Sequence, residues 1–289
     1  MIVWLASYPR SGNTLLRTVL FNTTGLASTS DEIDESKVVD LTKSGRHITG
    51  IIDMEGSWED FYISASQSEQ VFPVKTHRIA RDNQPAIYVV RDGRKACLSY
   101  SKFHERFTPS PHPDLLQLVL GDDFYGGWFE HYWTWAKREN TLVVRYEELI
   151  NPNGELLARL AEKVRQHDHT PSWKNPFDEL HKINPDFFRA GAAPWQGDIA
   201  WTKMIDAIFF HLHGDLMAEL GYASAEEVSD ARNQVPEGWI NVVNLASRAI
   251  SDKRMFQEIC HERQIVIDGL KEACDQRLEL IKKFSSSVK

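Results

Sequence analysis

The sequence predicts an α/β protein: a parallel β-sheet of the kind that carries a phosphate-binding loop, flanked by helices and followed by a helical C-terminal extension. Three observations lead to this prediction. Short apolar segments alternate with helix-like stretches along the first half of the chain, and a small-residue turn joins the first apolar segment to the first helix. The third observation is a long final segment that contains no proline.

The chain begins with a predicted strand at residues 2–5 and a predicted helix at residues 14–21, joined by a turn of mostly small residues. The first N–H groups of a helix have no partner inside it, and the helix dipole makes that end electropositive. This order of elements therefore favours phosphate binding. Gly12 allows a sharp turn and a close approach of the backbone to a ligand. Asn13 and Thr14 can cap the helix or offer a side-chain donor to a phosphate oxygen.

The spacing of this loop is close to that of the Walker A motif, Gly-x-x-x-x-Gly-Lys-Ser/Thr. However, Ser7 stands at the position of its first glycine and Asn13 at the position of its lysine. The cation has moved into the loop, as Arg10. We therefore predict a loop that binds phosphate, but not the phosphates of ATP or GTP.

The following segments continue the alternation of strands and helices. Nearly continuous apolar strands that alternate with helices indicate a parallel sheet covered on both faces, with ligands beyond the carboxyl ends of its strands. Since Arg10, His77 and Arg91 each follow a predicted strand, we expect them in one crevice. The predicted strands are residues 71–77, 86–90 and 141–146, the predicted helices are 95–103 and 127–137, and the polar insert 23–56 is predicted to be loop with short helices.

The last part of the chain differs from the rest. We predict a first domain at residues 1–223 and a helical extension at 224–289, which opens with the capping-box pattern Ser-Ala-Glu-Glu at residues 224–227. A helix packed on the domain and a short coiled coil or docking helix both fit the pattern, so a homo-oligomer or a partner on this helix stays open. Its apolar residues at helical spacing are Phe256, Ile259, Val266, Leu270, Ala273, Leu280 and Phe284, interrupted by Arg263 and Arg277.

Composition narrows the class of protein. The formal net charge of −8 disfavours a nucleic acid partner, whereas a phosphorylated ligand needs only a few local cations. The three cysteines form no Cys-x-x-Cys pair, which fits a reducing compartment. There is no apolar run long enough to span a membrane, and Arg10 and Arg17 interrupt any signal peptide. We therefore expect a cytoplasmic protein.

The spacing of the histidine pairs does not favour a metal site. His211 and His213 lie two residues apart on a predicted helix, so they cannot face the same way, and His167 and His169 sit in a polar stretch. We expect no metal.

Several segments carry motifs that belong together: residues 8–14 (Tyr-Pro-Arg-Ser-Gly-Asn-Thr), 75–77 (Lys-Thr-His), 88–100 with Arg91 and Ser99 eight apart, 127–135 (Gly-Trp-Phe-Glu-His, then Trp135), 145–149 (Arg-Tyr-Glu-Glu-Leu), 188–191 (Phe-Arg-Ala-Gly) and 220–222 (Leu-Gly-Tyr). In this order they resemble the motifs of the sulfotransferases that use 3′-phosphoadenosine 5′-phosphosulfate (PAPS). The resemblance covers about residues 1–223.

Three positions depart from the family pattern. Arg10 stands where the family usually has lysine, Leu15 where many members have a tryptophan under the adenine, and Ala190 where a lysine often helps to hold the 3′-phosphate. These changes point away from the animal phenol and steroid enzymes and towards a bacterial-type relative.

The resemblance implies an in-line transfer of a sulfuryl group from PAPS to an acceptor hydroxyl or amine, with 3′-phosphoadenosine 5′-phosphate (PAP) as product. It makes His77 the general base, with Lys75 and Arg10 neutralising the charge on the leaving 5′-phosphate. The residues that it implies for binding the nucleotide are Arg10, Ser11, Gly12, Asn13 and Thr14 at the 5′-phosphate, Arg91 and Ser99 at the 3′-phosphate, Arg189 and Gly191 closing the site, and Tyr146 at the adenine.

The sequence disfavours two other classes of protein. A P-loop kinase or nucleotide hydrolase would need the Walker lysine and an acidic residue at a strand end to bind magnesium, and neither is evident in this sequence. A non-catalytic scaffold would not need Lys75 and His77. The acceptor stays open among a glycan, a lipid, a peptide natural product and a small alcohol or phenol. By their position beside the proline loop, the residues expected to line the acceptor pocket are Phe103, Phe107, Phe124 and Tyr125.

Overall fold

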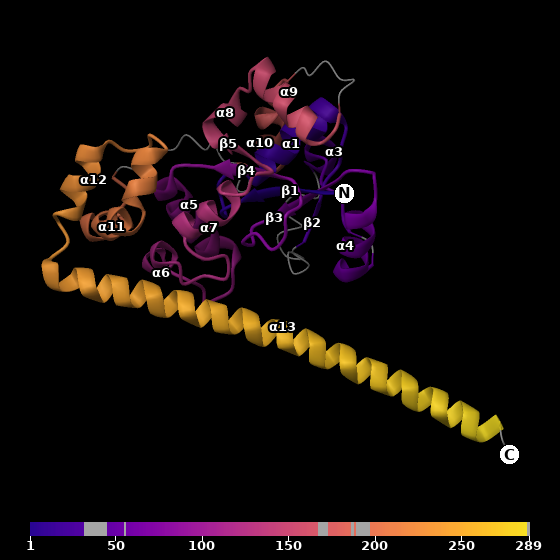
Figure 1. The fold of residues 1–289 in the computed structure, drawn as a ribbon. Helices are drawn as coiled ribbons and strands as arrows, with labels where there is room; N and C mark the ends of the chain where they lie inside the picture. Colours follow the sequence, from indigo (N-terminus) through magenta and orange to yellow (C-terminus); the bar gives the residue numbers. More distant parts are fainter. Residues whose placement is uncertain (32–44, 55, 167–172, 186–187, 189–196, 288–289) are drawn as a thin grey trace.

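The computed structural model describes residues 1–31, 45–54, 56–166, 173–185, 188 and 197–287. Its centre is a parallel sheet in the order β2-β3-β1-β4-β5 (Figure 1). Because β1 pairs with β3 on one side and β4 on the other, the strand order reverses at β1, the position where α/β proteins bind ligands. The strands are β1 (Ile2–Ser7), β2 (Thr29–Ser30), β3 (Phe72–Thr76), β4 (Ala86–Val90) and β5 (Thr141–Arg145).

Helices cover both faces of this sheet, which confirms the predicted fold class. Successive strand side chains point to opposite faces, and β1 shows the consequence. Val3 and Leu5 pack with α1 (Asn13–Thr24), α8 (Tyr146–Ile150) and α9 (Gly154–Lys163). Trp4 and Ala6 belong to the core on the other face, to which α4 (Trp58–Gln67), α5 (Gly93–Phe107), α6 (Leu115–Leu120), α7 (Trp128–Ala136) and α11 (Lys203–Glu219) contribute.

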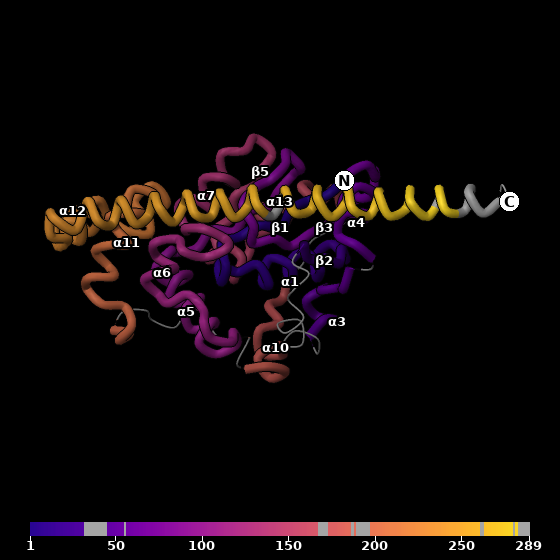
Figure 2. The backbone as a smooth tube through the Cα atoms, turned by 90° about the horizontal axis from the view of Figure 1, so that it is seen from below, coloured from indigo at the N-terminus to yellow at the C-terminus, as the bar shows by residue number. Residues whose placement is uncertain are grey.

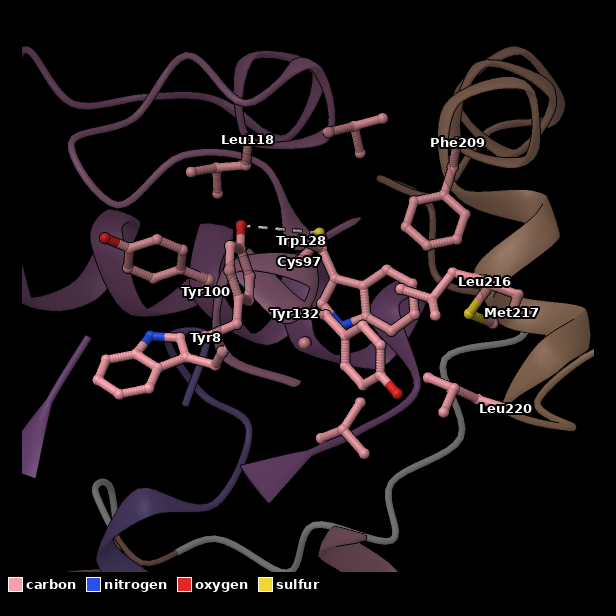
Figure 3. Close-up of a cluster of buried hydrophobic side chains, with 14 of the residues drawn as sticks. Tyr8, Cys97, Tyr100, Leu118, Trp128, Tyr132, Phe209, Leu216, Met217 and Leu220 are labelled. Carbon is pink, nitrogen blue, oxygen red and sulfur yellow. Dashed lines mark hydrogen bonds between the residues drawn. The ribbon is translucent and has the colours of Figure 1, made fainter. Parts of the chain in front are cut away.

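The second core gathers around the indole of Trp128, which is fully buried. Figure 3 shows this ring between Phe209, Leu216 and Met217 of α11 on one side and Tyr8 on the other. The α7 helix therefore lies between α11 and the loop that follows β1.

Two local expectations were wrong. The strand expected over 141–146 ends at Arg145, and Tyr146 opens α8, because the Glu148 carboxylate accepts a hydrogen bond from the Arg145 N–H (2.8 Å) and starts a helix there. Neither Asn13 nor Thr14 caps α1. The N-cap is Gly12, at a φ of 107° that glycine adopts easily. The short elements β2, α3 (Arg46–Thr49), α4, α6 and α10 (Phe177–Ile183) were not individually predicted.

The capping box predicted at Ser224 is confirmed. Its hydroxyl accepts from the Glu227 N–H (3.1 Å), while the Glu227 carboxylate accepts from the Ser224 N–H (2.8 Å). The helix that follows, α12 (Ala225–Arg232), places Val228 and Ala231 in the same core as α11.

The last helix, α13 (Glu237–Ser287), first runs along the body and then extends beyond it (Figures 1 and 2). Near the body it buries Val243 and forms ion pairs between Lys253 and Asp122 (2.9 Å) and between Arg254 and Glu130. Further along, the large apolar side chains are exposed, among them Ile265, Val266, Leu270 and Ile281.

Over the described ranges, we find no helix with both the length and the apolar character needed to cross a bilayer.

Candidate functional site

The candidate site lies where β1, β3 and β4 end. Arg91, which follows β4, donates from Nη1 to the backbone oxygen of Arg10 (2.9 Å), and the Nδ1 of His77, which follows β3, lies 2.7 Å from the backbone oxygen of Ser7. The chain from Ser7 to Arg10 therefore contacts both His77 and Arg91, so the three residues expected in one crevice lie at the same edge of the sheet.

The loop after β1 folds back before it enters α1. Arg10 has a positive φ of 62° and Gly12 one of 107°, and the N–H of Ser11 donates to the carbonyl of Tyr8 (3.1 Å). The first i→i−4 bond of α1 joins the N–H of Leu16 to the carbonyl of Gly12 (3.0 Å), so the N–H groups of residues 13–15 precede it. The hydroxyl of Ser11 is fully buried and makes no hydrogen bond. Since a buried hydroxyl without a partner is costly, this loop fits a bound oxyanion that accepts from it.

Gly12 and Arg91 enclose the ring of Tyr146. A Cβ atom at Gly12 would lie 2.5 Å from the Tyr146 ring, and the Arg91 guanidinium stands 4.4 Å from the centre of that ring. The loop, the end of β4 and the end of β5 thus meet at one aromatic side chain.

The side-chain amide of Asn13 points towards β1. Its Nδ2 donates to the carbonyl of Leu5 (2.7 Å) and approaches Ser7 Oγ (3.4 Å), so the side chain turns back towards β1. Thr14 is half-buried on the first turn of α1.

The hydrogen bond at Nδ1 defines the tautomer of His77. A carbonyl oxygen can only accept, so the proton of the neutral ring lies on Nδ1, and Nε2 carries the lone pair. The Tyr125 ring stands edge-on to the imidazole, with the two centres 5.7 Å apart. A neutral histidine held in this tautomer can take a proton at Nε2.

Lys75 is buried at the end of β3, two residues before His77. Alternate residues of a strand lie on the same face, so the strand directs Lys75 and His77 to the same side as far as its geometry continues. Between them, Thr76 donates to the Asp31 carboxylate (2.8 Å), which ties β3 to the end of β2.

Arg10 extends from the loop towards α5. Its Nε donates to the hydroxyl of Ser99 (3.4 Å), and its guanidinium lies 5.1 Å from the centre of the Phe103 ring. Arg10 thus joins Ser99 and Arg91, the residues that the resemblance places at the 3′-phosphate.

Among the aromatic residues expected at the acceptor pocket, Phe103 packs against Phe107, with ring centres 5.1 Å apart, and Tyr125 faces His77. Phe124 is exposed and lies under the guanidinium of Arg78 (4.8 Å). Arg189 and Gly191, together with His167 and His169, lie outside the described residues.

Sequence reasoning missed two residues that shape the site. Ser7 supplies the carbonyl that fixes His77, and Asp123 fixes Tyr125 by accepting from its N–H (3.2 Å). Burial raises the pKa of the Asp123 carboxyl, which also accepts from the Tyr100 hydroxyl (3.2 Å). Ser7 precedes the phosphate loop directly, and this adjacency to a strand end was the available signal.

The described segments contain no group of three His, Cys, Asp or Glu side chains arranged to hold a metal ion. His211 lies near the Asn244 side chain (2.9 Å), and His213 Nε2 lies 2.9 Å from the carbonyl of Val119.

Comparison with known proteins gives the family. A family model described as a sulfotransferase domain matches residues 2–162, more than half of the chain. Mouse sulfotransferase 4A1 is 24% identical over 228 residues, which cover 74% of this chain and 78% of that protein. The 3-beta-hydroxysteroid sulfotransferase of Cavia porcellus is 31% identical over 84 residues, which cover 26% of this chain and only 29% of that enzyme.

A solved structure, mouse sulfotransferase SULT7A1 complexed with PAP, aligns with 80% of this chain and 87% of its own at 17% identity and a TM-score of 0.45. The family assignment follows from the extent of the match to the sulfotransferase domain. The chain belongs to the sulfotransferase family of enzymes.

Proposed function

We propose that this protein transfers a sulfuryl group from PAPS to an acceptor hydroxyl or amine and releases PAP. The observation that carries the proposal is the pairing of His77 with the phosphate loop: its Nδ1–H is donated to Ser7, the residue just before the loop. A proton acceptor is thereby fixed beside an anion-binding helix terminus. Family membership supports the same reaction, as does the resemblance of the Lys-Thr-His segment to the family's catalytic motif.

In the proposed step the acceptor oxygen or nitrogen attacks the sulfur atom in line with the leaving 5′-phosphate oxygen. His77 takes the acceptor's proton at Nε2 while the bond between sulfur and that oxygen breaks. Lys75 neutralises the charge that builds on the 5′-phosphate, and Arg10 adds to the positive potential of the crevice. The loose transition state of such transfers makes positioning and charge stabilisation the main contributions of the protein.

For the nucleotide we propose two anion subsites. The 5′-phosphate would rest on the start of α1, where the buried Ser11 hydroxyl can donate to it. The 3′-phosphate would lie at Arg91 and Ser99, with Arg10 beside them. Tyr146 is proposed for the adenine, since it lies against both Gly12 and Arg91. Arg189 and Gly191 are assigned to the nucleotide by the sequence resemblance alone.

For the acceptor we propose a hydroxyl or amine compound bound against Tyr125, which lies against His77, and Phe103, which lies against Arg10. The candidates remain a glycan, a lipid, a peptide natural product and a small alcohol or phenol.

Calorimetric binding of PAP, ATP and AMP tests the donor class. We expect tight binding of PAP, weak binding of ATP and AMP, and a loss of PAP affinity in Ser99→Ala. Ser101→Ala is the matched control on the same helix, because Ser101 contacts Glu105 instead of the crevice. Equal or tighter binding of ATP would overturn the proposal and favour a kinase-like enzyme.

A further inference from the structure

We propose that α7 is a positioning helix for the sulfuryl transfer proposed above, on which this inference rests. The ring N–H groups of three of its residues hold the chain just beyond β3 and β4. Trp128 Nε1 donates to the carbonyl of Arg91 (3.2 Å), His131 Nε2 to that of His77 (2.8 Å), and Trp135 Nε1 to that of Arg78 (2.9 Å).

The three donors form one stripe. Their spacing of three and then four residues places them on the same face of a helix, and all three side chains are at most 1% exposed. The opposite face of α7 is turned towards solvent. There Phe129 and Trp133 are partly exposed and their rings stack, with centres 5.7 Å apart. The hydrogen bonds to the crevice are therefore confined to the buried stripe.

Carbonyl groups beyond the end of a strand have lost their partners in the sheet, and in a buried position they need another donor. Here that donor is a side chain packed in the core. The packing of the core therefore determines where each carbonyl lies. His77 and Arg91 follow the ends of β3 and β4 and carry the proposed base and the proposed 3′-phosphate contact. α7 consequently sets the positions of both.

His131 is held in the tautomer that this role requires. Its Nδ1 lies 3.0 Å from the hydroxyl of Tyr88 on β4. The carbonyl of His77 can only accept, so Nε2 carries the ring proton and Nδ1 of the neutral ring accepts from the Tyr88 hydroxyl, whose pKa burial raises. This is the tautomer that lets Nε2–H donate to the carbonyl of His77. The Tyr8 ring, at the phosphate loop, packs edge-on against the same imidazole (5.9 Å).

The arrangement predicts separate effects for two of the donors. His131 acts on the residue proposed as the general base, so its loss should lower turnover. Trp128 acts on Arg91, so its loss should weaken nucleotide binding. A helix that merely stabilised the fold would instead lower the fraction of active protein in every variant, without separating the two properties.

The experiment compares His131→Phe, His131→Gln, Trp128→Phe and, as a matched control on the outer face of α7, Trp133→Phe. Turnover is followed as PAP release from PAPS with p-nitrophenol and with water as acceptor, and PAP affinity and binding stoichiometry are measured by calorimetry. The titration of His77 is followed by NMR, its signal assigned by its absence in His77→Gln.

We expect His131→Phe to lower turnover about tenfold to a hundredfold with little change in PAP affinity, since a displaced base loses its alignment. The pKa of His77 should change in the same variant. Because a glutamine amide N–H can reach the site of Nε2–H, His131→Gln should restore much of both properties. Trp128→Phe should weaken PAP binding about threefold to tenfold, as expected for one lost hydrogen bond, and Trp133→Phe should change neither.

Unchanged turnover and an unchanged His77 titration in folded His131→Phe would overturn the proposal, as would equal losses in all the stripe variants. If wild-type protein binds PAP but releases none from PAPS with either acceptor, neither compound is its acceptor, and turnover cannot be compared; binding of ATP as tight as that of PAP would instead mean that the proposed function fails. The His77 titration and the PAP affinities would then still decide whether α7 positions these residues.

Discussion

The Nδ1 nitrogen of His77 lies 2.7 Å from the backbone oxygen of Ser7, which joins the end of β3 to the start of the phosphate loop. This contact holds the proton on Nδ1 and leaves the basic lone pair on Nε2. We predict that His77→Ala lowers turnover by about two to four orders of magnitude, the usual contribution of general acid–base catalysis. PAP affinity should stay nearly unchanged, because no phosphate contact is removed.

Turnover and calorimetric PAP binding measured on the same preparation check this prediction. His112→Ala is a suitable control, because that histidine lies in the proline-rich segment, where its ring stacks on His104 (5.6 Å). A large loss of PAP affinity in His77→Ala would show that His77 serves the nucleotide and not the acceptor.

Gly12 combines a φ of 107° with close contact to Tyr146. We predict that Gly12→Ala lowers the free energy of unfolding by about 1–3 kcal/mol and weakens PAP binding, since the backbone conformation and the ring contact both oppose a methyl group. Chemical denaturation of Gly12→Ala, Tyr146→Ala and the double variant separates the two causes. If the cost vanishes in the Tyr146→Ala background, contact with the ring accounts for all of it and the backbone conformation for none.

The order of the elements was predictable because the strands of a sheet that is covered on both faces are almost entirely apolar and therefore stand out in the sequence. The phosphate loop was predictable from Gly12 and the strand before it. The contacts that fix the site were not. Ser7 acts through its carbonyl, which every residue has, so its place at a strand end was the only signal; His131 acts through a ring nitrogen bonded to the carbonyl of His77, a contact that residue spacing does not reveal. The direction of Asn13 likewise depends on the carbonyl of Leu5, which it reaches only once β1 and α1 have packed.

Cys97 should be chemically inert in the native protein. It is fully buried beside the Tyr8 hydroxyl, and burial raises its pKa to about 12, so almost no reactive thiolate exists at neutral pH. Cys260 and Cys274 are exposed on α13. We predict that iodoacetamide labels two thiols in native protein and three after denaturation, as mass spectrometry would count. Rapid native labelling of Cys97 would contradict its burial.

His213 should make the protein less stable in acid. Burial lowers its pKa from 6.5 to about 4, so below pH 6.5 the unfolded chain takes up a proton that the folded chain does not. The free energy of unfolding should therefore fall as the pH drops from 6.5 to 4, by about 1.4 kcal/mol per pH unit for this proton. His213→Phe should be less stable at pH 7, since the Val119 carbonyl loses its donor, but show a smaller fall. Urea unfolding at several pH values measures both, and equal slopes would refute the assignment.

The α13 helix meets the turn that presents Tyr125 to His77. Arg254 donates to the carbonyl of Gly121 (3.1 Å), pairs with Glu130, and lies so close to Gly126 that a Cβ atom there would be 2.8 Å from its Nη1. We predict that Arg254→Ala increases hydrogen exchange at residues 121–127 and weakens acceptor binding. The reason is that the alanine variant loses the hydrogen bonds of a largely buried guanidinium, so residues 121–127 open more readily.

The neighbouring Lys253 provides the matched control for Arg254. Its ion pair with Asp122 is more exposed, with side chains 56% and 26% accessible, so Lys253→Ala should change stability by less than about 1 kcal/mol and leave the exchange of the turn unaltered. Hydrogen exchange followed by mass spectrometry, together with the acceptor KM, compares the two variants. Equal behaviour of both would mean that α13 only rests on the turn, whereas a selective effect of Arg254→Ala would show that the helix supports the wall of the acceptor site.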